Sequence, residues 1–426
     1  MSAKSLAPLT LAIVLASCSF GSNAVGNTSV GEARSVLPQV TQRGKGAQWV
    51  TFTPRTTSDV YSAIVLGPDK NVWFIDELAG GLVRMEENGS IKEFSLSGVL
   101  TGSAISMAVG ADKKFYILDE SANVIRVTEK GLAQSIPIPS GDSTSLDGLA
   151  LGPDGNIWFA EFNHIGRITP AGKITEFSYP SGFSPNQYGG VTTGSDGNVW
   201  FGDSSGNAIG RIVPSTGKIT TFTIPVSCSP APVVLANDGN VWFVCLTTSP
   251  LLGRVTPKGQ ITTFAVGGTF SFNETEQFCS RGPDGDPWCA SRNDGNIFHV
   301  SSKTHKTTTF DPPLGSGVAP DALAAGADGN VWVDTVGGEI AVLVSNPMTV
   351  TPNKLEFSAP SQTQTLRVSE NGVSSWTAKS SKTSVATVTQ GKSNSAFNVS
   401  SAGKGSCKIT IADSLGNSVA VKVNVH

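Results

Sequence analysis

The segment GPDGNIWF at residues 152–159 is one of seven related octapeptides in the chain. The other six are GPDKNVWF (67–74), GADKKFYI (110–117), GSDGNVWF (194–201), ANDGNVWF (236–243), GPDGDPWC (282–289) and GADGNVWV (326–333). Their first residues lie 42 to 46 positions apart. A fixed period of this length with Asp-Gly turns is typical of a β-propeller, in which each repeat forms one four-stranded blade. The sequence therefore predicts an all-β fold with a seven-bladed propeller.

Two positions of the octapeptide have clear structural roles. The Asp-Gly pair supplies the positive φ angles that a two-residue hairpin needs between the inner strand and the next one. A large aromatic residue recurs six positions after the start, and we expect it to pack between neighbouring blades rather than to stack on a ligand. These residues are Trp73, Tyr116, Trp158, Trp200, Trp242, Trp288 and Trp332.

The third strand of most repeats carries an arginine, and the last repeat lacks a fourth strand. Arginine recurs at 84, 126, 167, 211 and 254, whereas the sixth repeat has His299, which we interpret as a blade-surface residue rather than as a ligand. The missing fourth strand has its counterpart in QWVTF at residues 48–52. We expect this N-terminal strand to complete the seventh blade and so to remove unpaired sheet edges.

The two ends of the chain differ from the repeats. Residues 1–18 combine Lys4, an apolar core and the lipobox-like Leu-Ala-Ser-Cys, which predicts a signal peptide with lipidation at Cys18. Cleavage after Ala24 is the alternative. Residues 19–46 are expected to be a linker and 47–345 the propeller. Residues 346–426 contain about seven short alternating strands, which favour an immunoglobulin-like β-sandwich.

Export places the cysteines in an oxidising compartment, where disulfides persist. The hairpin centred on Asp284 sets Cys279 opposite Cys289, so this pair is predicted to form a cross-strand disulfide. Cys228 and Cys245 fall at one end of the fifth repeat and form a second predicted pair. Cys407 alternates with core isoleucines and is expected to be a buried free thiol.

Composition limits the partners. The formal charge is −3; the apolar core of the signal peptide is too short to span a membrane, and no other segment approaches 18 consecutive apolar residues. Nucleic-acid binding is therefore disfavoured. We expect an exported monomer, lipid-anchored to a bacterial envelope or secreted to the periplasm or beyond, whose partner is a small polar ligand or a protein at the propeller face.

Acidic residues recur where the loops enter the first strand and leave the second, around one mouth of the channel. Such carboxylates repel one another unless a cation, a raised pKa or an arginine compensates. The sequence thus favours a Mg²⁺ or Ca²⁺ site, with turn-capping, solvated acids as the equal alternative. The predicted metal ligands are Asp76, Asp119, Asp147, Glu161 and Asp203, and the predicted ligand-binding residues are Asn163 and Asp321.

Glu161 and His164 are the one pair of residues in the chain that resembles an acid/base couple. They fall in the same loop of the third repeat and are the predicted catalytic residues. A histidine that simply faces water is the alternative interpretation of His164.

The unit GPDGNIWFAEFNHIGRITPAGKITEF (152–177) resembles the repeat of the virginiamycin B lyase, or streptogramin lyase, family. The resemblance covers about residues 47–345. It implies a seven-bladed propeller and a Mg²⁺-dependent, non-hydrolytic elimination that opens the ester of a cyclic depsipeptide.

The family's catalytic histidines lie in a Pro-His-Gly-Ile-Thr segment that enters an inner strand. The equivalent slots here hold Ser62, Ile105, Asp147, Gly189, Ala231, Gln277 and Asp321. The family's Trp-Phe-Thr-Glu carboxylate is matched only by Glu161. We therefore expect a ligand- or cation-binding or interaction module without the catalytic histidines. The alternative is a Mg-dependent C–O lyase or a lactonase-like hydrolase that acts at the channel mouth.

Overall fold

The computed structural model describes most of the chain, in fifteen segments. These are residues 34–35, 38–41, 48–52, 61–86, 89–141, 146–183, 189–203, 205–246, 251–265, 277–292, 294–314, 318–344, 349–369, 376–413 and 418–426. Every regular element in them is a β-strand. These segments include no helix of the length and hydropathy that a membrane span requires. The predicted lipidation site Cys18 lies outside the described residues.

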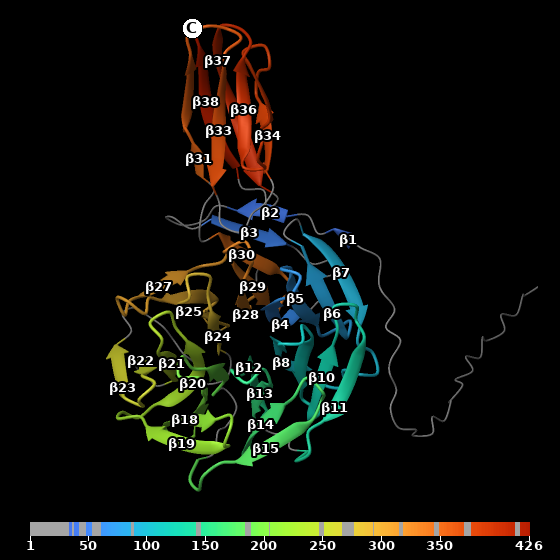
Figure 1. The fold of residues 1–426 in the computed structure, drawn as a ribbon, viewed down its shortest axis with the longest axis vertical. Helices are drawn as coiled ribbons and strands as arrows, with labels where there is room; N and C mark the ends of the chain where they lie inside the picture. The colour runs from blue at the N-terminus through green and yellow to red at the C-terminus, as the bar shows by residue number, and fades with distance from the viewer. Residues whose placement is uncertain are drawn as a thin grey trace, which may run out of the picture.

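Seven sheets follow one another along residues 34–344 (Figure 1). The first three contain β4 (Tyr61–Leu66), β5 (Val72–Asp76), β6 (Gly81–Met85) and β7 (Ser90–Ser95); β8 (Ala104–Val109), β9 (Phe115–Asp119), β10 (Asn123–Val127) and β11 (Ala133–Pro137); and β12 (Asp147–Leu151), β13 (Ile157–Ala160), β14 (His164–Ile168) and β15 (Ile174–Ser178).

The next three sheets repeat this antiparallel order of four consecutive strands. They contain β16 (Val191–Thr193), β17 (Val199–Asp203), β18 (Ala208–Val213) and β19 (Lys218–Thr223); β20 (Ser229–Leu235), β21 (Val241–Leu246), β22 (Leu251–Val255) and β23 (Ile261–Ala265); and β24 (Gln277–Arg281), β25 (Pro287–Ser291), β26 (Asn296–Val300) and β27 (Thr307–Phe310).

The seventh sheet joins the two ends of the repeat region. Its strands are β28 (Pro320–Ala325), β29 (Val331–Thr335), β30 (Ile340–Val344), β3 (Gln48–Phe52) and β2 (Pro38–Thr41). Antiparallel pairing of β3 with β30 sets Trp49 opposite Leu343. The N-terminal strand therefore lies where the sequence predicted it.

The first strands of the seven sheets form a ring. Each of β4, β8, β12, β16, β20, β24 and β28 contacts the next, and β28 contacts β4. Figure 1 shows the remaining strands of each sheet extending outward from this ring. The result is a propeller-like arrangement around a central axis.

Residues 19–46 are not only the linker that the sequence predicted. β1 (Arg34–Ser35) pairs with β7 in the first sheet, and β2 pairs with β3 in the seventh. This segment thus supplies the edge strands of two sheets. Each of them pairs with an outer strand, β7 or β3, whose backbone N–H and C=O groups would otherwise be unpaired.

The Asp-Gly turn is longer than the predicted two-residue hairpin. In the third sheet Leu151 pairs with Ile157, which leaves residues 152–156 as the loop. Gly155 has φ of 76°, whereas Asp154 is not among the residues with positive φ. Asp154 Oδ1 instead accepts hydrogen bonds from the backbone N–H of Asn156 (3.3 Å) and from Trp158 Nε1 (3.0 Å). The aspartate therefore holds both the turn and the indole.

The repeated aromatic residues pack between sheets, as predicted. Trp158 is fully buried and lies in one cluster with Val199 and Phe201 of the following sheet. It also stacks on Phe177 of its own fourth strand, with ring centroids 5.6 Å apart. Burial of this kind leaves no indole face open to a ligand.

The repeated arginines link each sheet to the next. The guanidinium of Arg167 lies 5.4 Å from the Trp158 ring centroid and 3.7 Å from Asp154 Oδ2. Its Nη1 donates a hydrogen bond to the carbonyl oxygen of Pro214, in the fourth sheet (3.1 Å). Arg211 reaches Pro257 in the fifth sheet in the same way (2.8 Å).

The C-terminal residues form two four-stranded sheets of their own. One sheet contains β31 (Thr349–Thr351), β33 (Thr363–Ser369), β36 (Ala396–Ser401) and β35 (Ala386–Gln390); the other contains β32 (Lys354–Phe357), β38 (Ser418–Val425), β37 (Gly405–Asp413) and β34 (Trp376–Ser380). Their apolar side chains make a separate core drawn only from this part of the chain. Cys407 lies in that core as a free, buried thiol.

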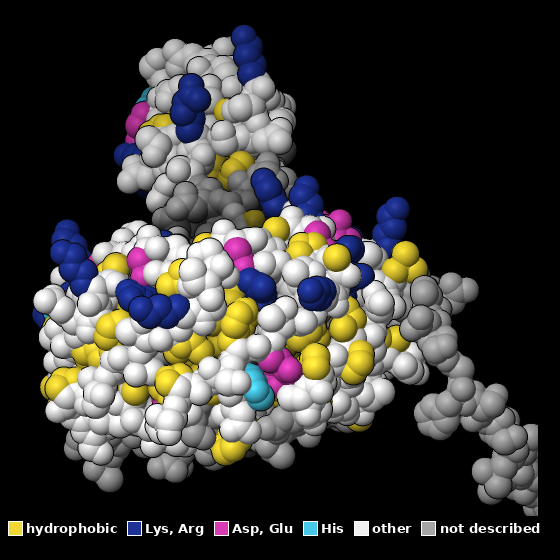
Figure 2. All heavy atoms as spheres, turned by 60° about the horizontal axis from the view of Figure 1, so that its bottom comes forward, with side chains coloured by type: hydrophobic (Ala, Val, Ile, Leu, Met, Phe, Trp, Pro, Cys, Tyr) yellow, Lys and Arg dark blue, Asp and Glu magenta, His cyan; other side chains and the backbone are white. Residues whose placement is uncertain are grey.

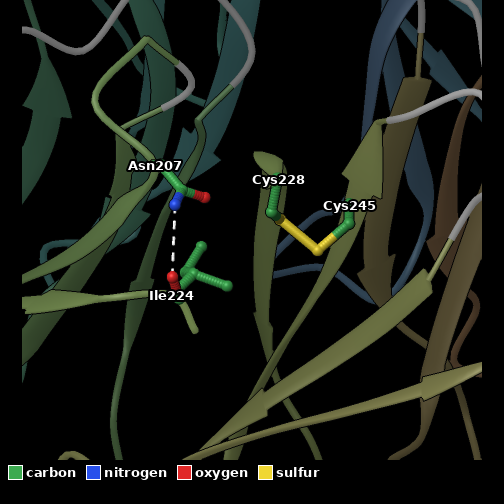
Figure 3. Close-up of a disulfide and its surroundings, with 4 residues drawn as sticks. All are labelled: Asn207, Ile224, Cys228 and Cys245. Carbon is green, nitrogen blue, oxygen red and sulfur yellow. Dashed lines mark hydrogen bonds between the residues drawn. A yellow bond between two sulfur atoms is a disulfide. The ribbon is translucent and has the colours of Figure 1, made fainter. Parts of the chain in front are cut away.

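Both cysteine pairs proposed from the sequence are disulfide-bonded in the structure. Cys279 and Cys289 face each other across β24 and β25. Cys228 and Cys245 join the start of β20 to the end of β21 (Figure 3). Beside the second disulfide, Asn207 Nδ2 donates a hydrogen bond to the Ile224 carbonyl oxygen (3.1 Å). Each disulfide thus fixes the two innermost strands of one sheet.

Candidate functional site

The acids predicted from the sequence gather at one end of the ring. Antiparallel pairing places the start of each first strand beside the end of the second, as in the pairs of Asp147 with Ala160 and Pro320 with Thr335. A β-bulge follows Asp147 and displaces the register there. Bulges re-aim side chains, which suits strand ends that carry a site.

Three of the predicted metal ligands cap the loops that follow their own strands. Asp76 Oδ1 accepts from the backbone N–H of Ala79 (2.9 Å), and Asp203 Oδ1 accepts from that of Gly206 (2.7 Å). Asp119 accepts from the backbone of Thr101, Ser121 and Asn123. All three carboxylates are buried, at 0–5% exposure. These three acids therefore cap turns, as the alternative to a metal site predicts, but they are buried rather than solvated.

Asp147, Glu161 and Asp203 all lie close enough to one buried tyrosine for their charges to raise its pKa. This residue, Tyr179, was not predicted from the sequence. Tyr179 follows β15, and its ring packs against Phe183 and Phe201. Burial raises the pKa of Tyr179 well above its usual value, and the negative charges of Glu161, Asp147 and Asp203 raise it further. The third and fourth sheets therefore share a buried, electronegative site.

Glu161 and His164 are joined through the backbone. The N–H of Glu161 donates to the carbonyl oxygen of His164 (2.8 Å), which closes the loop between β13 and β14. Glu161 is fully buried and its Oε2 accepts from Ser140 Oγ (2.7 Å). Among the described residues, no ion pair joins the two side chains. The structure thus places the predicted couple in one loop, with no hydrogen bond or ion pair between the two described side chains.

The two predicted ligand-binding residues occupy different surroundings. Asn163 is exposed, and its carbonyl oxygen accepts from the backbone N–H of Tyr179 (3.2 Å). Asp321 is buried and pairs with Arg292, whose Nε and Nη2 lie 2.7 and 2.6 Å from Asp321 Oδ1. Arg292 follows the second strand of the sixth sheet, so this ion pair links the sixth and seventh sheets.

A second buried carboxyl lies beside this ion pair. Burial raises the pKa of Asp334 well above its usual value, the neighbouring Asp321 carboxylate adds to the rise, and Arg292 opposes it. Asp334 Oδ1 accepts from the backbone N–H of Ala322 (2.5 Å). Asp334 is therefore protonated more readily than an ordinary aspartate.

Glu77 and Glu120 were not predicted, although both follow directly after predicted acids. Glu77 Oε1 accepts from Ser62 Oγ (2.5 Å) in its own sheet and from the backbone N–H of Ala104 (3.0 Å) in the next. Burial raises the pKa of Glu77, and the charges of Glu120 and Asp321 add to this rise. Both glutamates lie ten residues after the first residue of their repeat, and this shared position is the signal that could have identified them.

The axis of the ring is hollow near this end. A cavity of about 130 Å³ is lined by residues of five consecutive first strands, among them Ile105, Asp147, Pro232 and Cys279. A second cavity of about 330 Å³, lined by Leu151, Thr193 and Leu235 among others, follows towards the Asp-Gly turns. Asp147 is thus the predicted metal ligand that lines the axial cavity.

The structure does not gather the five predicted metal ligands into one metal-sized group. In the described segments, a single set of three or more ligand atoms lies within 4.8 Å of one another, and it consists of Asp284, Asp286 and His299 in the sixth sheet.

On the face in Figure 2, basic side chains stand singly or in small groups between acidic and hydrophobic ones.

All four histidines lie away from the first strands. His164 and His299 belong to third strands, β14 and β26. The His305 ring lies 4.1 Å from that of Phe264, at the outer edge of the fifth sheet. His426 ends the chain beside Glu356. The ring of first strands around the axis therefore contains no histidine.

This fold and site define a propeller-like, all-β protein with an acidic axial mouth. The virginiamycin B lyase family model matches residues 33–186 and 184–414, so the chain belongs to that family. A comparison with curated protein sequences finds no significant match.

Solved structures give the same picture. A catalytically inactive histidine-to-alanine variant of virginiamycin B lyase from Staphylococcus aureus with quinupristin is 26% identical, at a TM-score of 0.61 over 70% of this chain and 99% of that one. A streptogramin B lyase is 24% identical, at a TM-score of 0.61 over 69% and 96%.

An extracellular domain of a putative hybrid two-component system from B. thetaiotaomicron shares the fold at 12% identity. Its TM-score is 0.54, over 92% of this chain and 61% of that one.

Proposed function

We propose that this chain is an exported binding protein built on the scaffold of the virginiamycin B lyase family. In this proposal the seven sheets are the seven blades of a propeller (47–345), and residues 346–426 form an immunoglobulin-like domain. The positions of the four histidines carry the proposal, because none lies on a first strand.

The first strands lack the group that ring opening by elimination requires. Removal of a proton next to a carbonyl needs a base at the mouth. In the S. aureus relative, replacement of one histidine gives a catalytically inactive protein. The equivalent first-strand slots here hold no imidazole, and the buried Asp321 is already paired with Arg292. The scaffold therefore supports binding better than it supports the family reaction.

The acidic mouth favours a ligand with positive charge. Asp147, Glu161 and Asp203 act together on Tyr179, and Asp147 lines the axial cavity. Carboxylates in a buried site are stabilised by a hard cation or by a cationic ligand group. We propose that Asp147 binds Mg²⁺, Ca²⁺ or the charged end of a small polar ligand in this cavity, and that the nearby charges of Glu161 and Asp203 favour that positive charge. A protein that docks on this face is the competing partner.

Calorimetric titration with MgCl₂ and CaCl₂ tests the cation site. Wild-type protein is expected to bind one ion, and Asp147→Asn is expected to lose that binding. Asp119→Asn is the matched control, because its carboxylate caps a loop in the second sheet. An Asp147→Asn variant that binds as wild type does would contradict the site.

A second candidate function is a Mg-dependent lyase or a lactonase-like hydrolase. The buried Tyr179 with three acids favours it, because strongly perturbed titratable groups gather at active sites. Glu161 would then act as the acid or base. Turnover of a streptogramin or lactone that is abolished in Glu161→Gln would support this function, and absence of wild-type turnover would exclude it for those substrates.

Export and lipidation at Cys18 are part of the proposal. The extracellular domains among the structural relatives support an exported location. Mass spectrometry of the mature N-terminus distinguishes a lipidated Cys18 from cleavage after Ala24.

A further inference from the structure

The sixth sheet departs from the repeat at two positions that lie together. In the third sheet the turn aspartate, Asp154, is followed by Asn156 and lies 3.7 Å from Arg167. The fourth and fifth sheets keep the same three residue types. The sixth sheet has aspartate in place of the asparagine and histidine in place of the arginine. One neutral and one basic side chain are thus replaced by a carboxylate and an imidazole.

The three side chains of the sixth sheet converge. Nε2 of His299 lies 2.8 Å from Asp284 Oδ2 and 3.6 Å from Asp286 Oδ2. Asp284 Oδ1 is turned away and accepts from Trp288 Nε1 (3.0 Å). Asp286 Oδ1 accepts from Ser302 Oγ (2.5 Å), and its Oδ2 accepts from the Ser302 backbone N–H (3.2 Å). Neighbours thus hold both carboxylates in place, and Oδ2 of each is the oxygen nearer to His299.

Nε2 of His299 is the point on which the three side chains converge. Nε2 is inaccessible to solvent and has no partner at an acceptable hydrogen-bond angle, although Asp284 Oδ2 is within reach. Nε2 and the two carboxylate oxygens all lie within 4.8 Å of one another. Ligand atoms around one metal ion are arranged in this way, because the ion occupies the space between them.

The ring of His299 is also fixed from the other side. It lies on the Trp288 indole, with ring centroids 4.7 Å apart. The indole and the two carboxylates therefore hold the imidazole between them.

The sixth sheet can dispense with its arginine. Arg167 and Arg211 each reach a proline carbonyl in the turn between the third and fourth strands of the next sheet. In the seventh sheet the corresponding strands, β30 and β3, come from opposite ends of the repeat region, so no such turn connects them. An arginine at position 299 would therefore lack this acceptor.

We propose that Asp284, Asp286 and His299 bind a divalent transition-metal ion, with Zn²⁺ the best fit. Imidazole and carboxylate ligands suit Zn²⁺, Ni²⁺ and Cu²⁺, whereas Mg²⁺ and Ca²⁺ prefer oxygen ligands alone. Three protein ligands leave a fourth position for water. The ion ties the turn between β24 and β25 to β26, as the arginine does in other sheets. This site lies outside the acidic mouth and does not depend on the proposed function.

Titration of the full chain with ZnCl₂ tests the site, by calorimetry and by the shift in melting temperature. Wild-type protein is expected to bind one tight equivalent and to melt at a higher temperature with Zn²⁺. His299→Arg and Asp286→Asn restore the residues of the other repeats, so both should fold. Each is expected to weaken binding by more than about tenfold.

His426→Ala is the matched control, because His426 is also beside a carboxylate, Glu356, but far from this cluster in sequence. It is expected to bind Zn²⁺ as wild type does. Absence of the tight equivalent in wild type, or its retention in His299→Arg, would overturn the site and leave a simple His–Asp ion pair. Substitution with Co²⁺ gives an independent readout, since tetrahedral absorption bands should appear in wild type and not in His299→Arg.

Discussion

The turn aspartate is the residue that unites the repeat. In each of the first, third, fourth, fifth, sixth and seventh sheets it accepts a hydrogen bond from the Trp Nε1. Buried indole N–H groups need such a partner. The two residues of the Asp-Gly pair therefore have different roles. The glycine adopts the positive φ of the turn, and the aspartate accepts a hydrogen bond from the aromatic residue that packs between the sheets.

Two lysines occupy the glycine position of this turn. Lys113 has φ of 60°, whereas Gly155 of the third sheet has φ of 76°. The left-handed conformation costs an L-residue about 1 kcal/mol. Lys113→Gly is therefore expected to stabilise the protein by about 0.5–1 kcal/mol, in denaturant unfolding. Gly155→Lys is the reciprocal variant and should destabilise by a similar amount. A Lys113→Gly variant that is no more stable than wild type, or a Gly155→Lys variant that is no less stable, would contradict the strain.

Asp334 should give the protein a distinctive pH dependence. Its pKa is raised in the folded state, so the unfolded chain releases this proton first as pH rises. Stability from this group is thus fully present below its unfolded pKa of about 3.9 and is lost as pH rises towards the folded value. Asn does not titrate, so Asp334→Asn is expected to remove this fall in stability with rising pH. Parallel melting temperatures of variant and wild type from about pH 4 upward would contradict this origin.

For single residues, the sequence predicted the surroundings only of those whose place within a repeat was known. The aromatic residues and both cysteine pairs were predictable, because a fixed spacing puts each at a known place in a hairpin. Tyr179 and Glu77 were not. Tyr179 follows a fourth strand, and it reaches the acids only because the chain folds back beside Asn163.

The N-terminal strand β3 is the element on which the seventh sheet depends. Phe52 stacks on Trp332, with ring centroids 5.8 Å apart, in the way that Phe177 stacks on Trp158. Phe52→Ala is expected to cost about 3–5 kcal/mol in denaturant unfolding. Phe177→Ala is the matched control and should cost less, because Phe177 is only half-buried.

Deletion of residues 47–53 should lower the melting temperature further, because it removes the pairing with β30 as well as the packing of Trp49. An unchanged melt would show that the strand does not hold the ring together.

The two disulfides act at the same scale. They close loops with sequence separations of 17 and 10 residues. Each is expected to contribute about 3 kcal/mol through the unfolded state. Reduction should therefore lower the melting temperature, and Cys279→Ser with Cys289→Ser should reproduce part of that loss. Mass spectrometry that finds four free thiols in protein purified without reductant would contradict both pairs.

The boundaries of elements were harder to predict than their existence. The strand pattern placed β3 correctly, but β1 and β2 fall in a segment that reads as a linker. Both are edge strands, and their pairing depends on partners in the first and seventh sheets rather than on local pattern.

At the scale of the whole molecule, the fold resembles that of the lyase family, but the residues at the axial mouth differ from those that the family reaction requires. The ring of first strands, the inter-sheet aromatic residues and the family match all follow the lyase scaffold. The axial mouth instead carries Asp147, Glu161 and Arg292, with no histidine on a first strand. A fold shared by many proteins does not fix the reaction that one member performs.

The most direct measurement is incubation of the full chain with quinupristin and Mg²⁺, followed by mass spectrometry, with virginiamycin B lyase from S. aureus as the positive control. Elimination leaves the mass of the ring unchanged, so the linear product is recognised by its fragmentation and retention. We predict that the cyclic compound remains intact. A linear product that is lost in Glu161→Gln would contradict the account and assign the family reaction to this protein.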